Sequence, residues 1–298
     1  MSRNIQGILI ALVGAALYSA HDAIIKGLGA ELPAIQIAFF AYLLGLPLIL
    51  MMLVADPAPA NLRPANPLWM ALRVLGVLTA TVGAFYAFLV LPLAETYTIL
   101  FAAPLLITLL AVPLLGEALR WRRALAVLVG LAGVLVVLQP GTREIGLGHL
   151  AALASALGNA MVHITARRIG SSERLPLMVL YPMLATTLIL GCLLPLDFAP
   201  VTGRAFGGLA VLAVLAFAAM LCLIEGFKRA EAGLVAPMQY SQLLWGVLFG
   251  FLFFREVPEG STLLGAVLIV GSGIYIVLRE ARQSPRPPVP VSVAPGPS

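Results

Sequence analysis

The sequence has 298 residues, of which 61% are hydrophobic and only 10% are charged. A soluble domain carries about 25% charged residues, so this composition excludes a soluble globular fold and indicates side chains solvated by lipid. The net charge of +5 does not indicate nucleic-acid binding, because the basic residues stand in small groups between apolar stretches, where membrane proteins keep them.

Ten apolar stretches, each near the length of about 20 residues that crosses a bilayer, follow one another along the chain. They cover residues 5–28, 34–55, 68–91, 95–115, 124–138, 147–168, 175–194, 205–228, 233–254 and 261–278. The first stretch resembles a signal peptide, but Tyr18 is too large for the cleavage position before Ala20, so we expect an uncleaved helix. Residues 283–298 are rich in Pro, Val and Ser and are predicted to form a disordered tail. The predicted fold class is therefore an all-α polytopic membrane protein of ten transmembrane helices.

The basic residues predict the orientation of these helices. With the N-terminus in the cytoplasm, 14 of the 18 Lys and Arg residues fall in cytoplasmic loops or at cytoplasmic helix ends. An even number of crossings then places both termini in the cytoplasm.

The chain also repeats at a spacing of about 140 residues. Residues 126–128 (Ala-Val-Leu) recur as residues 266–268, Gly133 recurs as Gly273, and Glu117 matches Glu256 at a spacing of 139. We therefore predict one five-helix repeat over residues 1–140 and a second over 141–282. An odd number of crossings turns the second copy upside down, which is the inverted 5+5 design that recurs in secondary transporters.

Two motifs carry a family resemblance. Ala102-Ala103-Pro104-Leu105-Leu106 running to Leu114-Leu115-Gly116-Glu117 resembles the repeat of the drug/metabolite transporter superfamily, EamA branch. The segment from Val235-Ala236-Pro237 through Trp245 to Arg255-Glu256 resembles its second copy. The resemblance covers roughly residues 5–280 and implies a ten-helix carrier; such carriers include exporters of aromatic amino acids and toxic cations and importers of nucleotide-like metabolites. Arg255 departs from the family pattern, which usually has Gly there, and this puts a tight turn before Glu256 in doubt.

Polar residues within the apolar stretches are the candidate site residues, because an ionisable group at membrane depth usually faces a cavity. The first stretch carries a stripe of Gly14, Tyr18, Asp22 and Lys26, with His21 beside it. At a spacing of 141 the sixth stretch carries Ser155, Asn159, His163 and Arg167. We expect Asp22 and His163 to face each other across the pathway. Asp22 would receive an ammonium group, and Asn159 and His163 would donate to a carboxylate or relay a proton. Alternatively, Lys26 pairs with Asp22, and Lys26 and Arg167 reach the membrane interfaces.

Other stretches supply further candidates. Thr79 and Tyr86 share a stripe with Arg73, which either reaches the interface or binds an anion, and Glu225 either pairs with Lys228 or joins the site. The fourth and ninth stretches contribute Tyr97, Gln239, Tyr240, Gln242 and Trp245. Their aromatic rings form slots for a planar ligand or simply pack. Pro104 and Pro237 are predicted pivots, because each removes one backbone hydrogen bond. Gly246 and Gly250 permit a close helix contact.

The predicted function is a secondary transporter in a bacterial inner membrane that moves small metabolites by alternating access, with export of amino acids, aromatic ones in particular, preferred. Uptake or exchange of a nucleotide-like metabolite such as S-adenosylmethionine, and efflux of drug-like cations, are the alternatives. The sequence lacks the H-E-x-x-H, G-x-S-x-G and P-loop motifs, so an intramembrane enzyme using His21 and Asp22 is a remote possibility. We expect no catalytic residue, metal or cofactor, protons as a possible coupling ion, and a monomer or weak dimer.

Overall fold

The computed structural model describes residues 3–54, 63–118, 121–141, 144–170 and 172–283. Apart from Gln283, the predicted tail of residues 283–298 lies outside these ranges. The helices are α1 (Arg3–Leu28), α2 (Ala34–Val54), α3 (Pro67–Val90), α4 (Leu93–Leu100), α5 (Ala103–Leu115), α6 (Trp121–Leu138), α7 (Leu147–Ile169), α8 (Leu175–Leu193), α9 (Gly203–Arg229), α10 (Ala232–Val235), α11 (Ser241–Phe254) and α12 (Gly260–Gln283). Two short 3-10 turns are η1 (Leu194–Leu196) and η2 (Ala236–Tyr240).

Within the described residues, nine helices are long and apolar enough to cross a membrane, with α4 and α5 counted as one segment. The predicted all-α, multi-pass class is therefore confirmed. The side chains that face outward are apolar as well: Leu128, Leu188 and Val267 are 63%, 69% and 69% exposed. Helices that are apolar all round belong in lipid, which covers these side chains at no hydrophobic cost.

Two of the ten predicted stretches are interrupted near their prolines. The stretch of residues 95–115 divides into α4 and α5, and Pro104 lies in the first turn of α5. The stretch of residues 233–254 divides into α10, η2 and α11, and Pro237 lies in the first turn of η2. A proline lacks the N–H that would continue the preceding helix, but it is tolerated where a new helical turn begins.

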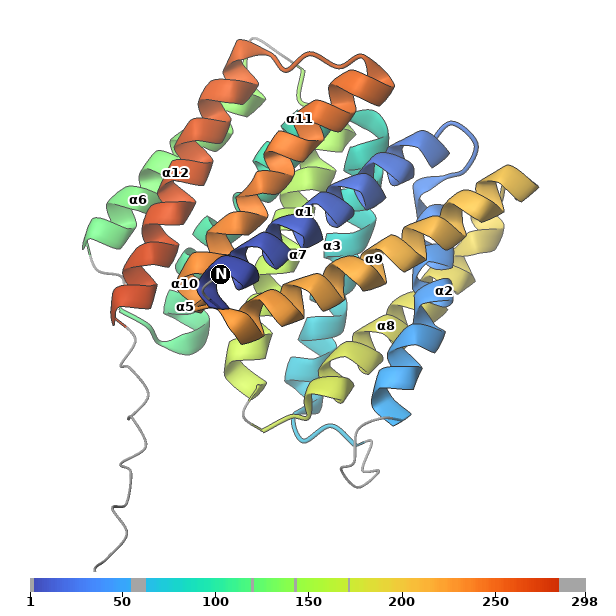
Figure 1. Cartoon of the computed structure of the whole chain (residues 1–298), viewed down its shortest axis with the longest axis horizontal. Coiled ribbons are helices and arrows are strands. Elements are labelled where there is room, and N and C mark those ends of the chain that lie inside the picture. The colour runs from blue at the N-terminus through green and yellow to red at the C-terminus, as the bar shows by residue number, and fades with distance from the viewer. Residues whose placement is uncertain (1–2, 55–62, 119–120, 142–143, 171, 284–298) are drawn as a thin grey trace, which may run out of the picture.

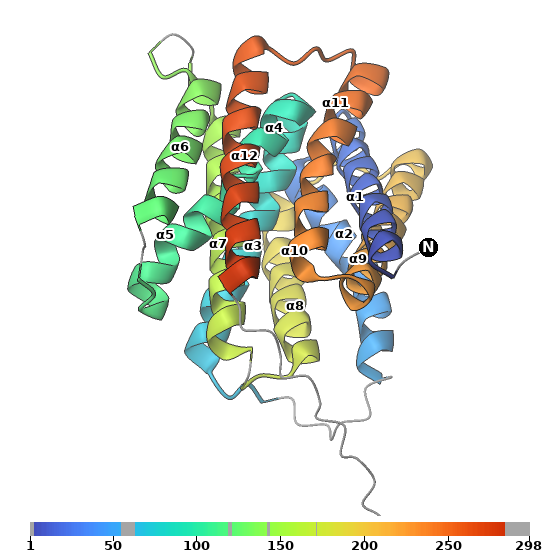
Figure 2. The ribbon, with the colours of Figure 1, turned by 60° about the vertical axis from the view of Figure 1, so that its left-hand side comes forward.

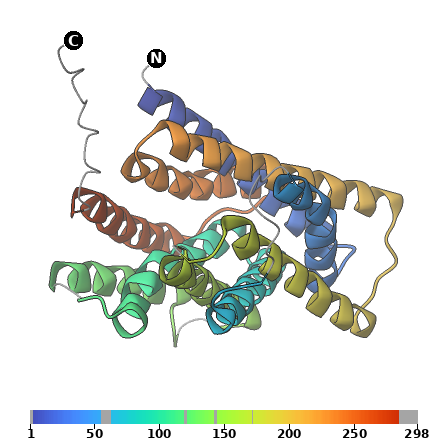
Figure 3. The ribbon, with the colours of Figure 1, turned by 90° about the horizontal axis from the view of Figure 1, so that it is seen from below.

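The helices pack in pairs that join the two halves of the chain. α1 packs along α9 and α3 packs along α7. α6 and α12 lie together at one edge of the bundle, while α2 and α8 lie together at the opposite edge (Figures 1 and 3). The connection between α11 and α12 lies at one end of the bundle, and α5 and α7 both finish at the other end (Figure 2).

Glycines allow the close approach of the crossing helices. A Cβ on Gly158 of α7 would lie 2.6 Å from the carbonyl oxygen of Gly76 on α3, and a Cβ on Gly7 of α1 would lie 2.9 Å from that of Gly226 on α9. Both distances are shorter than a carbon–oxygen contact permits, so these two crossings require glycine. Close backbone packing of this kind holds helices together in lipid, where burial of apolar surface provides little driving force between them.

Candidate functional site

A cavity of about 360 Å³ lies among α1, α2, α3, α8 and α9. Its wall is mainly apolar and aromatic, with Phe85 and Phe217 among the rings and Met178, Met183 and Met220 among the thioethers. The polar side chains in the wall are Tyr18, His21, Tyr42, Arg73 and Thr81. A mostly apolar pocket of this size with a few polar groups is typical of a small-molecule site.

Arg73 brings a positive charge to the wall of this cavity. Its Nε donates to the Met178 carbonyl oxygen at 2.7 Å, and its Nη1 donates to the Val162 carbonyl oxygen at 2.8 Å. Pro182 lies inside α8, four residues after Met178, and has no N–H to bond that carbonyl. Arg73 therefore satisfies a backbone group that the proline leaves free. Of its five N–H donors, these bonds use two.

Tyr42 and Thr81 form a polar contact in the same wall that the sequence reading did not single out. The Tyr42 hydroxyl lies 2.6 Å from Thr81 Oγ1 and joins α2 to α3. Both residues stand in predicted membrane-spanning stretches, and the signal that marks them is a hydroxyl among apolar neighbours. That signal is weak, because a hydroxyl in a helix often bonds the carbonyl of the preceding turn.

Asp22 is linked to the cavity through His21. His21 Nδ1 lies 2.7 Å from Asp22 Oδ1, and the Tyr97 hydroxyl donates to Asp22 Oδ2 at 2.6 Å. Tyr97 is only 1% exposed and packs its ring against Phe88 and Phe101. A carboxylate that accepts both bonds is satisfied within the protein. His21 lines the cavity, and Asp22 and Tyr97 stand behind it.

Gly246 makes room for Tyr97, because a Cβ at this position would overlap the tyrosine ring. A Cβ on Gly250 would lie 2.9 Å from Glu256 Oε2. The two glycines predicted to permit a close helix contact thus accommodate side chains of this same chain.

The other candidates on α11 and η2 contact neighbouring helices or residues of their own helix. Ser19 Oγ donates to the backbone carbonyl of Gln242 at 3.3 Å. The Tyr240 ring meets Phe101 edge-on with centroids 5.0 Å apart, and Trp245 stacks on Phe249 at 6.1 Å. These rings pack against neighbouring aromatic residues, and Gln239 lies in η2, outside the cavity wall.

The remaining candidates lie away from the cavity wall. Thr79, Asn159 and His163 are exposed, and Tyr86 is half-buried. No contact among the described residues joins Asp22 to His163, since the partners of Asp22 are His21 and Tyr97. Glu225 pairs with Arg229 at 2.8 Å and Lys228 at 3.9 Å, which agrees with the interfacial ion pair considered for it.

Two further ion pairs join the halves of the chain. Lys26 of α1 contacts Glu256 after α11, with Nζ 2.7 Å from Oε1, so it does not pair with Asp22 as considered from the sequence. Arg167 of α7 contacts Glu117 after α5, with Nη2 2.5 Å from Oε1. The tight turn before Glu256 is present despite Arg255, which takes the left-handed conformation at φ +58°, and the Glu256 N–H donates to the Gly250 carbonyl at 2.9 Å.

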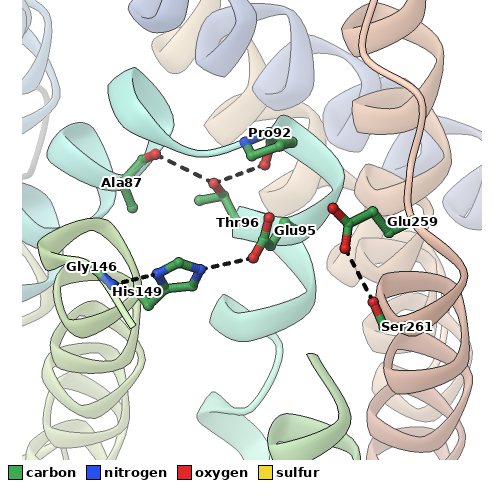
Figure 4. Close-up of polar contacts among 8 residues, drawn as sticks. All are labelled: Ala87, Pro92, Glu95, Thr96, Gly146, His149, Glu259 and Ser261. Atoms are coloured by element: carbon green, nitrogen blue, oxygen red, sulfur yellow. Dashed lines mark hydrogen bonds and ion pairs between the residues drawn. The ribbon is translucent and has the colours of Figure 1, made fainter. Parts of the chain in front are cut away.

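A third pair, between Glu95 and His149, was not singled out from the sequence. His149 Nε2 lies 2.9 Å from Glu95 Oε1, and the two residues are 5% and 2% exposed (Figure 4). An ionisable residue within an apolar stretch is the signal that marks both positions. Within the described ranges, no group of three or more His, Cys, Asp or Glu side chains could hold a metal ion.

Comparison with known proteins agrees with this architecture. The chain is 27% identical to the S-adenosylmethionine uptake transporter of Rickettsia prowazekii, over 93% of this chain and 94% of that protein. It is 28% identical to the pseudopaline exporter of Pseudomonas aeruginosa, over 89% and 93%, and 28% identical to the riboflavin transporter of Rhizobium johnstonii, over 96% and 95%. A solved crystal structure shares the fold with a TM-score of 0.63 and 22% identity, over 93% of this chain and 99% of that one.

The family model adds the assignment. The EamA-like transporter family matches residues 5–139 and again residues 146–279, which together span most of the chain. The resemblance seen in the two motifs is thereby confirmed. The chain belongs to the EamA-like transporter family.

Proposed function

We propose that this protein is a secondary transporter of a bacterial inner membrane that carries small amino-acid-like metabolites by alternating access. The observation that carries the proposal is the cavity of about 360 Å³, whose wall combines aromatic rings with the Arg73 guanidinium and the His21 imidazole, which Asp22 holds from behind. The relatives are transporters from bacteria and are similar over nearly their whole lengths, which supports both the activity and the location.

The proposed architecture is two inverted five-helix repeats, residues 1–140 and 141–282, with both termini in the cytoplasm. The two matches to the family model support the repeat. The packing supports it too: α1 against α9 has its counterpart in α7 against α3, and α1 against α11 has its counterpart in α7 against α5. The ninth crossing along the chain would consist of α10, η2 and α11, a broken helix of the kind that transporters place near their sites, and it would bring the number of crossings to ten.

The polar groups in the wall suit a zwitterion. Arg73 has N–H donors beyond the two bound to backbone carbonyls, and a guanidinium binds a carboxylate with two parallel hydrogen bonds. When Asp22 is ionised, His21 donates from Nδ1, and Nε2 is left as an acceptor for an ammonium group. Tyr18, Phe85 and Phe217 offer rings against which a planar group can pack. Of the residues singled out from the sequence, Tyr18 and His21 are the proposed contacts, and Asp22 and Tyr97 position His21.

Two substrate classes fit this description. Aromatic amino acids fit the zwitterion site and the rings, and their export is the first candidate. Uptake of S-adenosylmethionine, which joins an amino acid group to an adenine ring, is the second candidate, and the relative from Rickettsia prowazekii favours it. Both substrates have a carboxylate, so both assign the same role to Arg73.

Counterflow in proteoliposomes tests the proposal. Vesicles are loaded with unlabelled tryptophan, phenylalanine, tyrosine or S-adenosylmethionine, and entry of the labelled compound is followed. We expect exchange for at least one of them, and no exchange across the whole panel would refute the proposed function.

The role of Arg73 is tested with paired compounds that differ by the carboxylate: tryptophan and tryptophanamide, or S-adenosylmethionine and its decarboxylated form. Arg73→Gln should weaken apparent affinity for the carboxylate form by about 10- to 100-fold, the value of a hydrogen bond to a charged group. It should leave the carboxylate-free form unchanged. Arg168→Gln, which changes an arginine resting over the Trp69 ring, is the matched control.

A further inference from the structure

The buried pair of Glu95 and His149 lies apart from the cavity. It is at the opposite end of the bundle from the Arg167–Glu117 ion pair (Figure 2). Glu95 is in the first turn of α4, and His149 is in the first turn of α7. Besides the 2.9 Å contact between Nε2 and Oε1, His149 Nδ1 accepts the Gly146 N–H at 3.2 Å (Figure 4). Both ring nitrogens of the histidine therefore have defined partners.

These contacts determine where the protons are. A ring nitrogen that accepts an N–H carries no hydrogen, so Nδ1 is bare and the imidazole is neutral, with its hydrogen on Nε2. Nε2 then donates to Glu95 Oε1, which acts as the acceptor. Both ionisable side chains of this contact are almost fully buried. Burying a charge in a membrane protein is costly, and residues that do so usually serve transport.

A small cavity of about 50 Å³ adjoins Glu95. A single water needs roughly 10–15 Å³, so this cavity has room for water that could deliver a proton. The other titratable residues among its described lining are Glu256 and Glu259. Glu256 is bound to Lys26, and Glu259 accepts a hydrogen bond from Ser261 at 3.4 Å. The nearest acidic neighbours are thus held by other groups.

The repeat offers no counterpart to this pair. At the spacing of 139 residues that relates Glu117 to Glu256, Glu95 corresponds to Leu234, and at the spacing of 141 His149 corresponds to Ile8. Packing of the repeated helices therefore does not require ionisable side chains at these positions.

We propose that Glu95 is the proton-binding site through which a pH gradient drives transport, with His149 as the positioning residue that holds the carboxylate. The proposal rests on the proposed transport function. Protonation neutralises the buried charge, so the α4–α7 contact differs between the two protonation states, and a proton gradient can bias the conformational cycle.

Transport in proteoliposomes is the first test, using the compound from the panel that exchanges best. With one proton per substrate, a gradient of one pH unit supports about tenfold accumulation. Glu95→Gln should retain counterflow, which needs no driving force, and lose the response to the gradient. Glu259→Gln, which removes a carboxylate from the same small cavity, is the control and should respond like the unchanged protein. If Glu95→Gln accumulates substrate as the unchanged protein does, or if the unchanged protein ignores the gradient, the proposal is wrong.

Infrared spectroscopy of the reconstituted protein tests the site without any substrate. A pH titration should show a carboxyl band from a buried, protonated glutamic acid that is absent from Glu95→Gln, and its midpoint should shift in His149→Asn. Identical titrations for the unchanged protein and Glu95→Gln would overturn the proposal. Because this readout needs no transport, failure of the proposed function in counterflow and failure of the proton site are told apart.

Discussion

The ion pairs Lys26–Glu256 and Arg167–Glu117 occupy matching positions in the two halves of the sequence, yet the structure holds them very differently. The Lys26 and Glu256 side chains are 12% and 18% exposed, whereas those of Arg167 and Glu117 are 43% and 29% exposed. Lys26 also donates to the Leu91 carbonyl and lies over the Phe254 ring, and Glu256 Oε2 accepts the Leu93 N–H at 2.8 Å. Glu117 has instead a second, looser contact to Arg123 at 3.8 Å.

The difference indicates that the two ends of the bundle are closed to different extents. The Lys26–Glu256 pair joins α1, the α3–α4 turn and the end of α11 in a network where each buried charge has several partners. The Arg167–Glu117 pair joins α7 to the residue after α5 at the surface. Under the proposed alternating access, the first network would keep its end shut while the second end is free to open. The two pairs at matching sequence positions thus differ in strength, as the proposed inverted repeat predicts for a single conformation.

Loss of the buried pair should have the largest effect. Lys26→Met leaves the largely buried Glu256 carboxylate without its cation and the Leu91 carbonyl without its donor, and breaking a fully buried pair costs about 3–5 kcal/mol, which is the upper bound here. We expect a clear drop in the unfolding temperature of the detergent-solubilised protein, with part of the loss recovered in Lys26→Met/Glu256→Met. Lys228→Met changes a 68% exposed lysine and is the control. Equal melting of the two lysine variants would show that the network contributes no stability.

The turns before the two glutamates extend the comparison to the backbone. Gly116 has φ +71° and Arg255 has φ +58°, and each ends a helix just before its glutamate. A Cβ on Gly116 would meet no atom within 4 Å, so Gly116→Ala tests the backbone conformation alone. The left-handed conformation costs a residue with a Cβ about 1–2 kcal/mol, so we expect destabilisation near 1 kcal/mol, measured by denaturant unfolding. Gly203→Ala, at a glycine that also has open space around it but has no left-handed conformation, is the matched control.

The turn at Arg255 shows where the sequence can and cannot be read. The apolar stretches predicted the outer ends of most helices to within three residues, because hydrophobic length is a local property, but they missed the breaks within residues 95–115 and 233–254. The arginine obscured a turn that backbone hydrogen bonds to Gly250 and Phe251 nevertheless maintain. Contacts between residues distant in the sequence were harder to predict. Lys26 has an acidic neighbour one turn away in Asp22, but the packing of α1 against α11 brings the Lys26 side chain to Glu256 instead. The Glu95–His149 contact could not be predicted for the same reason. Each residue is an isolated ionisable side chain in the sequence, and only the packing of α4 against α7 brings the two together.

Removal of the exposed pair should have a small effect. Arg167→Met breaks the contact with Glu117 where solvent already screens both charges, and surface pairs contribute about 0.2–1 kcal/mol. We expect an unfolding free energy lower by about half a kcal/mol in dilute salt. The difference should vanish in high salt, because mobile ions screen exposed charges. A loss as large as that of Lys26→Met would contradict the unequal strengths inferred for the two ends.

Arg255→Gly should have the smallest effect, and of the opposite sign. Glycine adopts the left-handed conformation without the steric cost that the Cβ of Arg255 adds. Glycine also has more conformational freedom in the unfolded chain, which lowers the free energy of unfolding by about 0.5–1 kcal/mol. Because the Arg255 side chain is exposed, its removal costs little packing. The net expectation is a gain of about half a kcal/mol, measured beside Gly116→Ala in the same denaturant series. If Arg255→Gly were destabilising, the arginine would contribute a contact that offsets its backbone strain, and the end of the bundle near Glu256 would depend on more than its buried pair.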